Sequence, residues 1–157
     1  MELVSPKRAL KLCKDVESQE EIGGKKVVNE MIRLCIKENG IGLAAPQVGI
    51  NYKFFVAYFQ EYLEWRLFIN PTYRPLAQQT VDSIEGCLTY GSENTYKVKR
   101  YTKILAEWKE LDLKDGFTTK TIELSGISAI IFQHETDHIN SITVAAKGEK
   151  IKIEKDN

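Results

Sequence analysis

The two histidines of this chain are the residues with the clearest chemical potential, because they are its only histidines and stand four residues apart. They flank a glutamate in the run His134-Glu-Thr-Asp-His138. On a helix this spacing places both imidazoles on one face. The H-E-x-x-H pattern is typical of sites where two histidines bind a divalent metal ion and the glutamate, here Glu135, acts on metal-bound water. The alternative is a surface helix that happens to carry both histidines, and the spacing favours the metal site.

A catalytic metal site usually needs a third protein ligand and an open position. A downstream glutamate, as in relatives of thermolysin, is a poor candidate because only 19 residues follow His138 and their acids lie in a polar tail. A metzincin would continue to a glycine and a third histidine, and Ser141 and Val144 stand at those places instead.

A better third ligand lies upstream, in Glu85-Gly-Cys-Leu-Thr89. The glycine lets the backbone turn sharply beside Cys87, and a cysteine thiolate suits Zn²⁺ or Fe²⁺. Taken alone, Cys87 would be interpreted as a small buried hydrophobe, which is the interpretation for Cys13 and Cys35. The two histidines make Cys87 a candidate ligand.

Three motifs together resemble the peptide deformylase family, whose patterns are G-x-G-x-A-A-x-Q, E-G-C-x-S and Q-H-E-x-D-H. In this chain they read Gly40-Ile-Gly-Leu-Ala-Ala-Pro-Gln47, Glu85-Gly-Cys-Leu-Thr89 and Gln133-His-Glu-Thr-Asp-His138. Their order and approximate spacing match, and the resemblance extends from the first helix to His138. Departures are Thr89 in place of the usual serine and Asn94 where many bacterial relatives have an arginine.

The resemblance implies a hydrolase that removes the formyl group from the N-terminal formylmethionine of nascent polypeptides. It implies one divalent metal ion, Fe²⁺ or Zn²⁺ with Ni²⁺ or Co²⁺ as further options, held by Cys87, His134 and His138. The metal would lower the pKa of bound water towards ~7. Glu135 would act as general base and then as general acid. Gln47 and the backbone N–H of Leu88 would hold the formyl oxygen as it gains negative charge.

Two apolar or small-residue segments are candidates for binding the peptide. In the family the first motif pairs with the substrate as an added strand, which indicates Gly40, Ile41 and Gly42 as contacts. The alternative for this segment is a tight turn, which explains the glycines but not Gln47. Three isoleucines precede His134 by seven, four and three residues on the same predicted helix face and could line a methionine pocket. They are Ile127, Ile130 and Ile131, and ordinary core positions are the alternative for them.

Two helices must position these residues. Apolar residues at helical spacing predict a helix over 25–39, with Gly40 as its C-terminal cap. A second helix is predicted over 126–140, with Ser125 as its N-cap. It carries both histidines.

Strand-like alternation fills much of the remaining chain. Strands are predicted over 52–59, over 65–70 where Pro71 ends the run, within 95–113, and over 118–124 after a hairpin turn at Asp115-Gly116. Residues 74–94 look irregular apart from the cysteine motif, and the tail after Ser141 holds one more strand-like stretch. These elements predict an α+β fold with antiparallel strands packed around a central metal-binding helix, plus one N-terminal helix. We expect residues 1–157 to form one domain.

Composition sets limits on partners and compartment. Lys plus Arg and Asp plus Glu both number 22, so the overall charge predicts neither direct nucleic-acid binding nor attachment to an anionic membrane. The basic stretch 97–103 is interpreted as one solvated strand face. Three cysteines without close pairing indicate a reducing compartment. With neither a secretory signal nor an apolar run of transmembrane length, we expect a monomer in the cytoplasm or an organelle lumen.

The predicted partners are N-formylmethionyl peptides on nascent chains at the ribosome. One alternative is a metalloprotease or amidase of another specificity, which shares the metal chemistry. The other is a non-enzymatic domain with a structural metal or an inactive binding site. A structural site would want a fourth protein ligand, and it would leave Glu135 and Gln47 unexplained.

Overall fold

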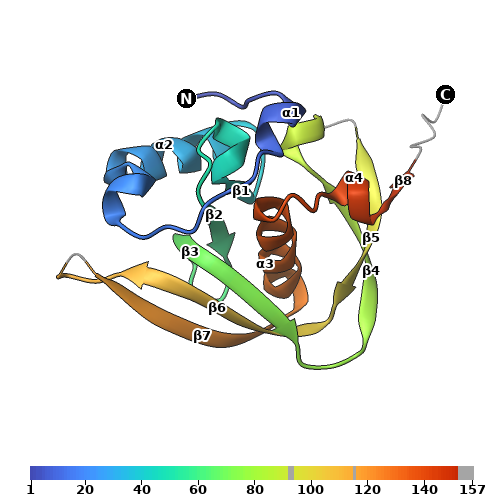
Figure 1. Ribbon diagram of the computed structural model, residues 1–157. Coiled ribbons are helices and arrows are strands. Elements are labelled where there is room, and N and C mark those ends of the chain that lie inside the picture. The colour runs from blue at the N-terminus through green and yellow to red at the C-terminus, as the bar shows by residue number, and fades with distance from the viewer. Residues whose placement is uncertain (92–93, 115, 152–157) are drawn as a thin grey trace.

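The helix that carries both histidines lies at the centre of the fold, between two antiparallel sheets. The computed structural model describes residues 1–91, 94–114 and 116–151. In it the helix α3 (Gly126–Ile139) crosses the middle of the molecule, with the larger sheet on one side and the smaller sheet on the other (Figure 1). The predicted α+β class is confirmed.

The larger sheet supplies the main hydrophobic core. Its order is β1-β2-β3-β6-β7, with every neighbouring pair antiparallel. The bounds are β1 (Gly42–Ala44), β2 (Phe54–Phe59), β3 (Glu64–Pro75), β6 (Lys103–Leu111) and β7 (Phe117–Ser125). Phe55, Phe59 and Phe68 pack with Phe132 of α3, and the ring centroids of Phe55 and Phe68 lie 4.8 Å apart. Burial of these aromatic rings holds α3 against the sheet.

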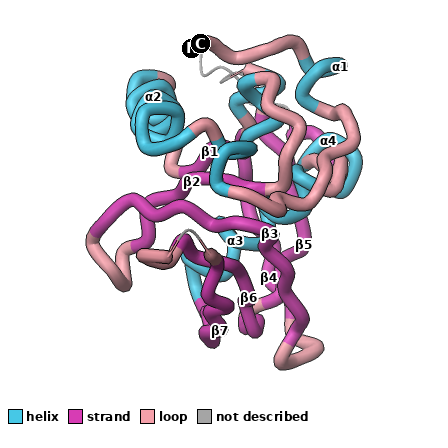
Figure 2. Tube along the Cα trace, turned by 60° about the vertical axis from the view of Figure 1, so that its left-hand side comes forward, coloured by secondary structure: helices cyan, strands magenta, loops and turns pink. Residues whose placement is uncertain are grey.

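The smaller sheet lies on the opposite side of α3 and has the order β4-β5-β8 (Figures 1 and 2). Its strands are β4 (Thr80–Gly86), β5 (Thr95–Tyr101) and β8 (Glu149–Ile151). Strand β5 alternates regularly, with Tyr96, Val98 and Arg100 buried and Lys97 and Lys99 exposed. The prediction of one solvated face over 97–103 is therefore wrong at Arg100. Arg100 follows Tyr96 and Val98 at two-residue spacing, so its side chain points to the same buried face. This spacing could be read from the sequence.

The other helices flank this arrangement. Helix α2 (Gly24–Lys37) covers the far side of β1 and β2, while α1 (Pro6–Ala9) and α4 (Val144–Lys147) are single turns too short for a periodic pattern. Three short 3-10 helices are η1 (Gln19–Ile22), η2 (Ala45–Val48) and η3 (Leu88–Tyr90). Gly40 is not the cap of α2: Asn39 takes the left-handed conformation, with φ of 58°, and donates to Ile36. Gly40 then closes the turn by donating to the carbonyl of Cys35.

Pro71 does not end its strand as predicted. Strand β3 continues to Pro75 through a register shift between Ile69 and Thr72, and Asn70 within it has φ of 47°. A bulge of this kind removes the need for the N–H that proline lacks, so an interior strand can accommodate it.

Residues 74–94 are not irregular, because β4 occupies their middle. Most of its residues are exposed on both faces, and its one buried side chain is the charged Glu85. An edge strand with that composition carries no apolar alternation. Strands β6 and β7 do pair as a hairpin, with Leu111 opposite Phe117, but Asp115 of the predicted turn lies outside the described residues.

The remaining predicted elements lie close to their expected positions. Strand β8 occupies the strand-like stretch predicted in the tail, and Ser125 precedes α3 in extended conformation but makes no side-chain capping hydrogen bond. Within the described ranges, no helix combines the length and apolar character needed to cross a membrane.

Candidate active site

The side chains of the cysteine and histidine motifs meet where the end of β4 reaches α3. Cys87 directly precedes η3, and its Sγ lies 3.8 Å from Nδ1 of His138. His134 lies one helical turn earlier and partly faces the cleft, while His138 is almost completely buried. The structure thus brings Cys87, His134 and His138 together from positions about 50 residues apart along the chain.

The environment of Cys87 favours a thiolate. Burial would raise the pKa of the thiol, but hydrogen bonds and charge from His134 and His138 outweigh burial and lower the pKa to about 5. For His134, burial would lower the pKa, and hydrogen bonds with Cys87 and Glu85 raise it to about 10. The two histidines thus favour the thiolate form of Cys87, which is the form in which cysteine binds a metal ion.

The donor set suits a divalent metal ion. Nε2 of His138 is buried and has no hydrogen-bond partner, so an imidazole nitrogen is available in the interior. In the described part of the chain, no three Cys, His, Asp or Glu side chains already adopt the close geometry of a formed metal site. One thiolate and two imidazoles are nevertheless ligands that Zn²⁺ and Fe²⁺ accept, and these residues fit such an ion.

Glu135 lies against Gly42 of the first motif. The residue is 4% exposed, and Oε2 is buried without a hydrogen-bond partner. A Cβ built at Gly42 would lie 2.8 Å from Oε1 of Glu135, so any larger residue there would displace the carboxylate. Burial raises the pKa of Glu135, against the opposing charges of His134 and His138. A side chain at residue 42 would therefore force this carboxylate to move, which is a reason for glycine separate from the approach of a second chain.

Gln47 is held in one orientation. Its Oε1 accepts a hydrogen bond from the backbone N–H of Ala44 at 2.8 Å, so its amide nitrogen must face the other way. Nε2 donates to Oγ1 of Thr89 at 3.0 Å and to Sγ of Cys87 at 3.8 Å. The hydroxyl of Thr89 therefore accepts a hydrogen bond as a serine hydroxyl could, and the second N–H of Gln47 donates to the cysteine sulfur.

A cleft of about 530 Å³ runs past these groups. It is bounded by the 38–42 segment, the end of β4 and the start of η3, and one face of α3. Gln47, Cys87, Leu88, His134 and Glu135 line it. So do the other predicted substrate contacts, which are Gly40, Ile41, Gly42, Ile127, Ile130 and Ile131. His138 does not line the cleft and lies behind Cys87.

The three isoleucines differ in depth within the cleft. Ile127 is 66% exposed at the mouth, Ile130 is half-buried, and Ile131 is 7% exposed. Ile41 and Ile84 are also exposed at the mouth, on the opposite walls. The cleft therefore has an apolar lining that deepens along α3 towards His134, suited to an apolar side chain.

A buried charged row supports the histidines from behind. Arg100, which is 1% exposed, donates to both oxygens of Glu85 at 2.7 and 2.9 Å and to Oδ2 of Asp137 at 2.9 Å. Oε1 of Glu85 in turn lies 2.7 Å from Nδ1 of His134. Burial would raise the pKa of Glu85, but the hydrogen bonds with Arg100 and His134 lower it to about 2. A carboxylate that contacts one ring nitrogen fixes the orientation of the other.

Sequence reasoning gave no role to Arg100 or to Gln133, and both anchor α3 to the smaller sheet. The carboxamide of Gln133 accepts from the N–H of Tyr101 and donates to its carbonyl, each at 2.9 Å. Asn94, which stands where many relatives have arginine, donates to the carbonyl of Tyr90 at 2.6 Å. Its amide is therefore committed to the chain's own backbone.

Comparison with known proteins agrees with this geometry. Residues 4–154 match the sequence family described as polypeptide deformylase. A peptide deformylase of Wolbachia sp. subsp. Drosophila simulans is 32% identical over 141 residues, covering 83% of this chain and 76% of that protein. Peptide deformylase 1 of Bifidobacterium longum is 32% identical over 128 residues, or 73% of this chain, which spans 56% of that protein's length.

Solved structures show the same fold. A probable peptide deformylase from Synechococcus phage S-SSM7 superposes with a TM-score of 0.79 at 28% identity, over 94% of this chain and 99% of that one. The peptide deformylase of Thermotoga maritima gives a TM-score of 0.77 at 30% identity, over 94% of this chain and 95% of that one. The chain therefore belongs to the peptide deformylase family, hydrolases that remove the N-formyl group from newly made peptides.

Proposed function

We propose that this peptide deformylase removes the formyl group of N-formylmethionyl peptides in the cleft along α3, with a divalent metal ion held by Cys87, His134 and His138. The observation that carries the proposal is the convergence of these three side chains with Glu135 and Gln47 beside one cleft. A bound metal ion would polarise the formyl carbonyl and the attacking water. Fe²⁺ and Zn²⁺ suit the ligands best, and Ni²⁺ or Co²⁺ are compatible.

Glu135 moves the proton in this proposal. Its Oε1 lies 3.9 Å from Nε2 of His134, so the carboxylate stands next to the ligand cluster without occupying it. The free Oε2 can accept a proton from the attacking water. When the C–N bond breaks, the same carboxyl group returns that proton to the departing amine nitrogen.

Two N–H groups would receive the carbonyl oxygen. The fixed carboxamide of Gln47 lines the cleft and directs one N–H at Sγ of Cys87, and this N–H would turn to the carbonyl oxygen when substrate binds. The backbone N–H of Leu88 is the second, because Leu88 begins η3 and the first N–H groups of a helix have no acceptor within it. Donors held in place before the reaction stabilise the developing oxyanion charge, and loss of one such donor commonly lowers the rate by ~10²–10³.

The peptide would lie along the outer edge of β1. This strand, Gly42–Ala44, is at the end of the larger sheet and pairs only with β2 there. Gly40, Ile41 and Gly42 lead into it along the cleft, so an extended peptide can add to the edge through its backbone. Ile127, Ile130 and Ile131 then receive the methionine side chain from the facing wall.

The physiological setting follows from the substrate. Formylated N-termini occur on nascent chains, so the partner is a peptide emerging from the ribosome, and we place the enzyme in the cytoplasm or an organelle lumen as a monomer.

The test replaces Glu135 by glutamine, which keeps the shape of the side chain and removes the base. We expect Glu135→Gln to retain metal and peptide binding while kcat on formyl-Met-Ala-Ser falls by at least ~10². Glu107→Gln, an exposed substitution on β6, serves as the control. Metal content is measured on the same preparations. Wild-type turnover by Glu135→Gln would rule the mechanism out.

A further inference from the structure

The chain segment after the metal-binding helix packs directly behind Cys87. In this C-terminal segment, residues 143–151, Val144 is buried in a small cluster with Cys87, Tyr96 and Val98. The hydroxyls of Thr143 and Tyr90 lie 2.9 Å apart, which joins the segment to η3. The segment therefore contacts both the cysteine and the turn that follows it.

The segment is also fixed to the smaller sheet. Strand β8 pairs with β5 from Thr95↔Ile151 to Lys97↔Glu149. A Cβ built at Gly148 would lie 2.6 Å from both the carbonyl oxygen of Lys97 and a methyl of Val98. Only glycine allows this approach, so the position of Gly148 sets the position of the residue before it.

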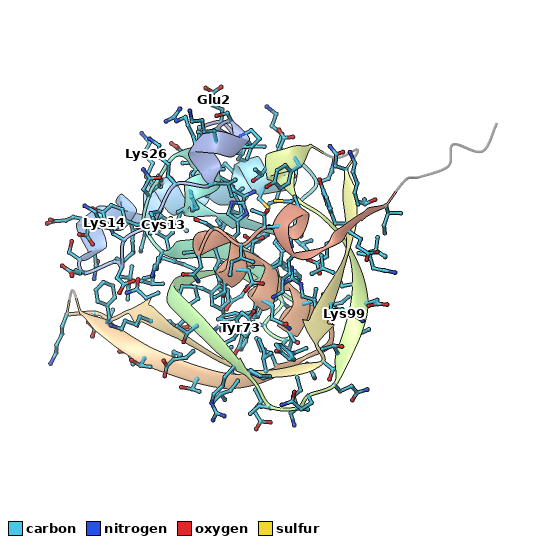
Figure 3. All side chains as sticks on the ribbon, turned by 45° about the vertical axis from the view of Figure 1, so that its right-hand side comes forward. Glu2, Cys13, Lys14, Lys26, Tyr73 and Lys99 are labelled. Atoms are coloured by element: carbon cyan, nitrogen blue, oxygen red, sulfur yellow. The ribbon has the colours of Figure 1, made fainter. Side chains whose placement is uncertain are left out.

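Lys147 uses that position to reach the metal-binding helix. Its Nζ donates to Oδ2 of Asp137 at 2.8 Å, and Asp137 is the residue immediately before His138. The same carboxylate accepts from Arg100 at 2.9 Å and from the hydroxyl of Tyr73 at 2.7 Å (Tyr73 is labelled in Figure 3). Asp137 thus receives donors from β3, from β5 and from the C-terminal segment.

The charges explain the position of Lys147. Glu85 and Asp137 are both buried and share Arg100, and Glu85 has a further nitrogen partner in Nδ1 of His134. Lys147 gives Asp137 a second cationic partner in the same way. An exposed ion pair contributes little, and the side chain of Lys147 is 33% exposed, but its carboxylate partner is 7% exposed and already hydrogen-bonded.

We propose that Lys147 is a positioning residue for the active site. It holds Asp137, and through Arg100 it holds Glu85 against His134, so that the two histidines keep the orientation in which they face Cys87. The single turn α4 and β8 serve to place this lysine. The inference rests on the proposed metal site, and Lys147 itself does not touch substrate.

The test compares Lys147→Met, which keeps the length of the side chain and removes its charge, with Lys147→Arg and with Lys150→Met. Lys150 is exposed on β8 in the same segment and serves as the matched control. The readouts are the rate at which Zn²⁺-loaded protein loses the ion to a chelator, kcat and KM on formyl-Met-Ala-Ser, and Tm.

We expect Lys147→Met to lose Zn²⁺ ~10–100-fold faster and to lower kcat on a similar scale, the usual range for residues that orient metal ligands. KM should stay within about twofold, and Lys147→Arg should recover most of the loss. Gly148→Ala, which pushes the segment away from β5 without removing a charge, should reproduce the faster release.

Two results would overturn the inference: Zn²⁺ release by Lys147→Met at the rate of Lys150→Met, or a lowered Tm with release and kcat of the folded protein unchanged. Failure of the wild-type chain to bind Zn²⁺ or to deformylate the peptide would instead sink the proposed function.

Discussion

The two sheets bury different kinds of side chain against α3. The larger sheet presents aromatic rings, with Phe55, Phe59 and Phe68 packed around Phe132. The smaller sheet presents only a few apolar residues, and its largest fully buried side chain is Arg100. The same helix therefore has a dry side that fixes its place and a charged side that orients its histidines. Apolar packing of α3 and the polar contacts of His134 thus come from different sheets.

The division can be tested most strongly at Arg100. Arg100→Met leaves Glu85 and Asp137 buried without their shared cation, and breaking a buried pair in this way typically costs ~3–5 kcal/mol. Activity of the remaining folded protein should also fall by ~10–100-fold, because Glu85 is no longer held against His134. Urea unfolding and kcat on formyl-Met-Ala-Ser measure the two effects.

The control is Lys99→Met, one residue earlier on the exposed face of β5, where the side chain meets only the exposed Asp82 at 3.4 Å (Lys99 is labelled in Figure 3). If Arg100→Met loses stability but each folded molecule keeps full activity, the charged row is structural only. The division between the sheets would then disappear.

The contrast also explains what sequence could predict. The three motifs predicted Cys87, His134, His138, Glu135 and Gln47 as site residues, and the structure brings these side chains together, because reaction chemistry restricts residue types at short spacings. They could not reveal Arg100, whose contacts with Glu85 and Asp137 span 15 and 37 residues of sequence. The sequence does place Arg100 two residues after Val98, so both side chains point to the same face of the strand. A charged residue at such a position was nevertheless interpreted as solvated.

The missed elements have a related cause. Strand β4 buries only Glu85 and lies at a sheet edge, so its sequence has no apolar alternation to detect. The bulge at Asn70 and Pro71 depends on a distant partner, since the side chain of Asn70 bonds both backbone groups of Val16. Sequence patterns predict elements that are stabilised by neighbouring residues or by a buried apolar face. Strand β4 and the bulge at Asn70 have neither kind of stabilisation.

A more selective effect, on stability without activity, is expected on the dry side. Phe68 is 0% exposed and contacts Phe55, Phe59, Trp108 and Phe132. Phe68→Ala should lower the free energy of unfolding by about 3–5 kcal/mol through the cavity that it leaves. Because Phe68 does not line the cleft, kcat and KM of the folded fraction should stay within about twofold below Tm.

Phe68→Leu is the matched variant, since it fills more of the cavity and should lose less stability. Urea unfolding and steady-state kinetics on the same samples check both statements. A tenfold loss of kcat in folded Phe68→Ala would mean that the aromatic core also orients the histidines, which the proposed division excludes.

The smallest effect is expected where α3 faces neither sheet but the cleft. Ile130 is half-buried in the cleft lining, so Ile130→Trp adds volume to a partly open space and should disturb folding little. If this space receives the methionine side chain, the indole fills it, and KM for formyl-Met-Ala-Ser should rise by about 10-fold or more. A formyl-Gly-Ala-Ser peptide has no side chain to exclude, so its KM should not change.

Ile36→Trp, on the exposed face of α2, controls for the added surface. An equal rise in KM for both peptides would show that Ile130 affects the backbone path instead, and unchanged kinetics in a folded variant would remove Ile130 from the binding site.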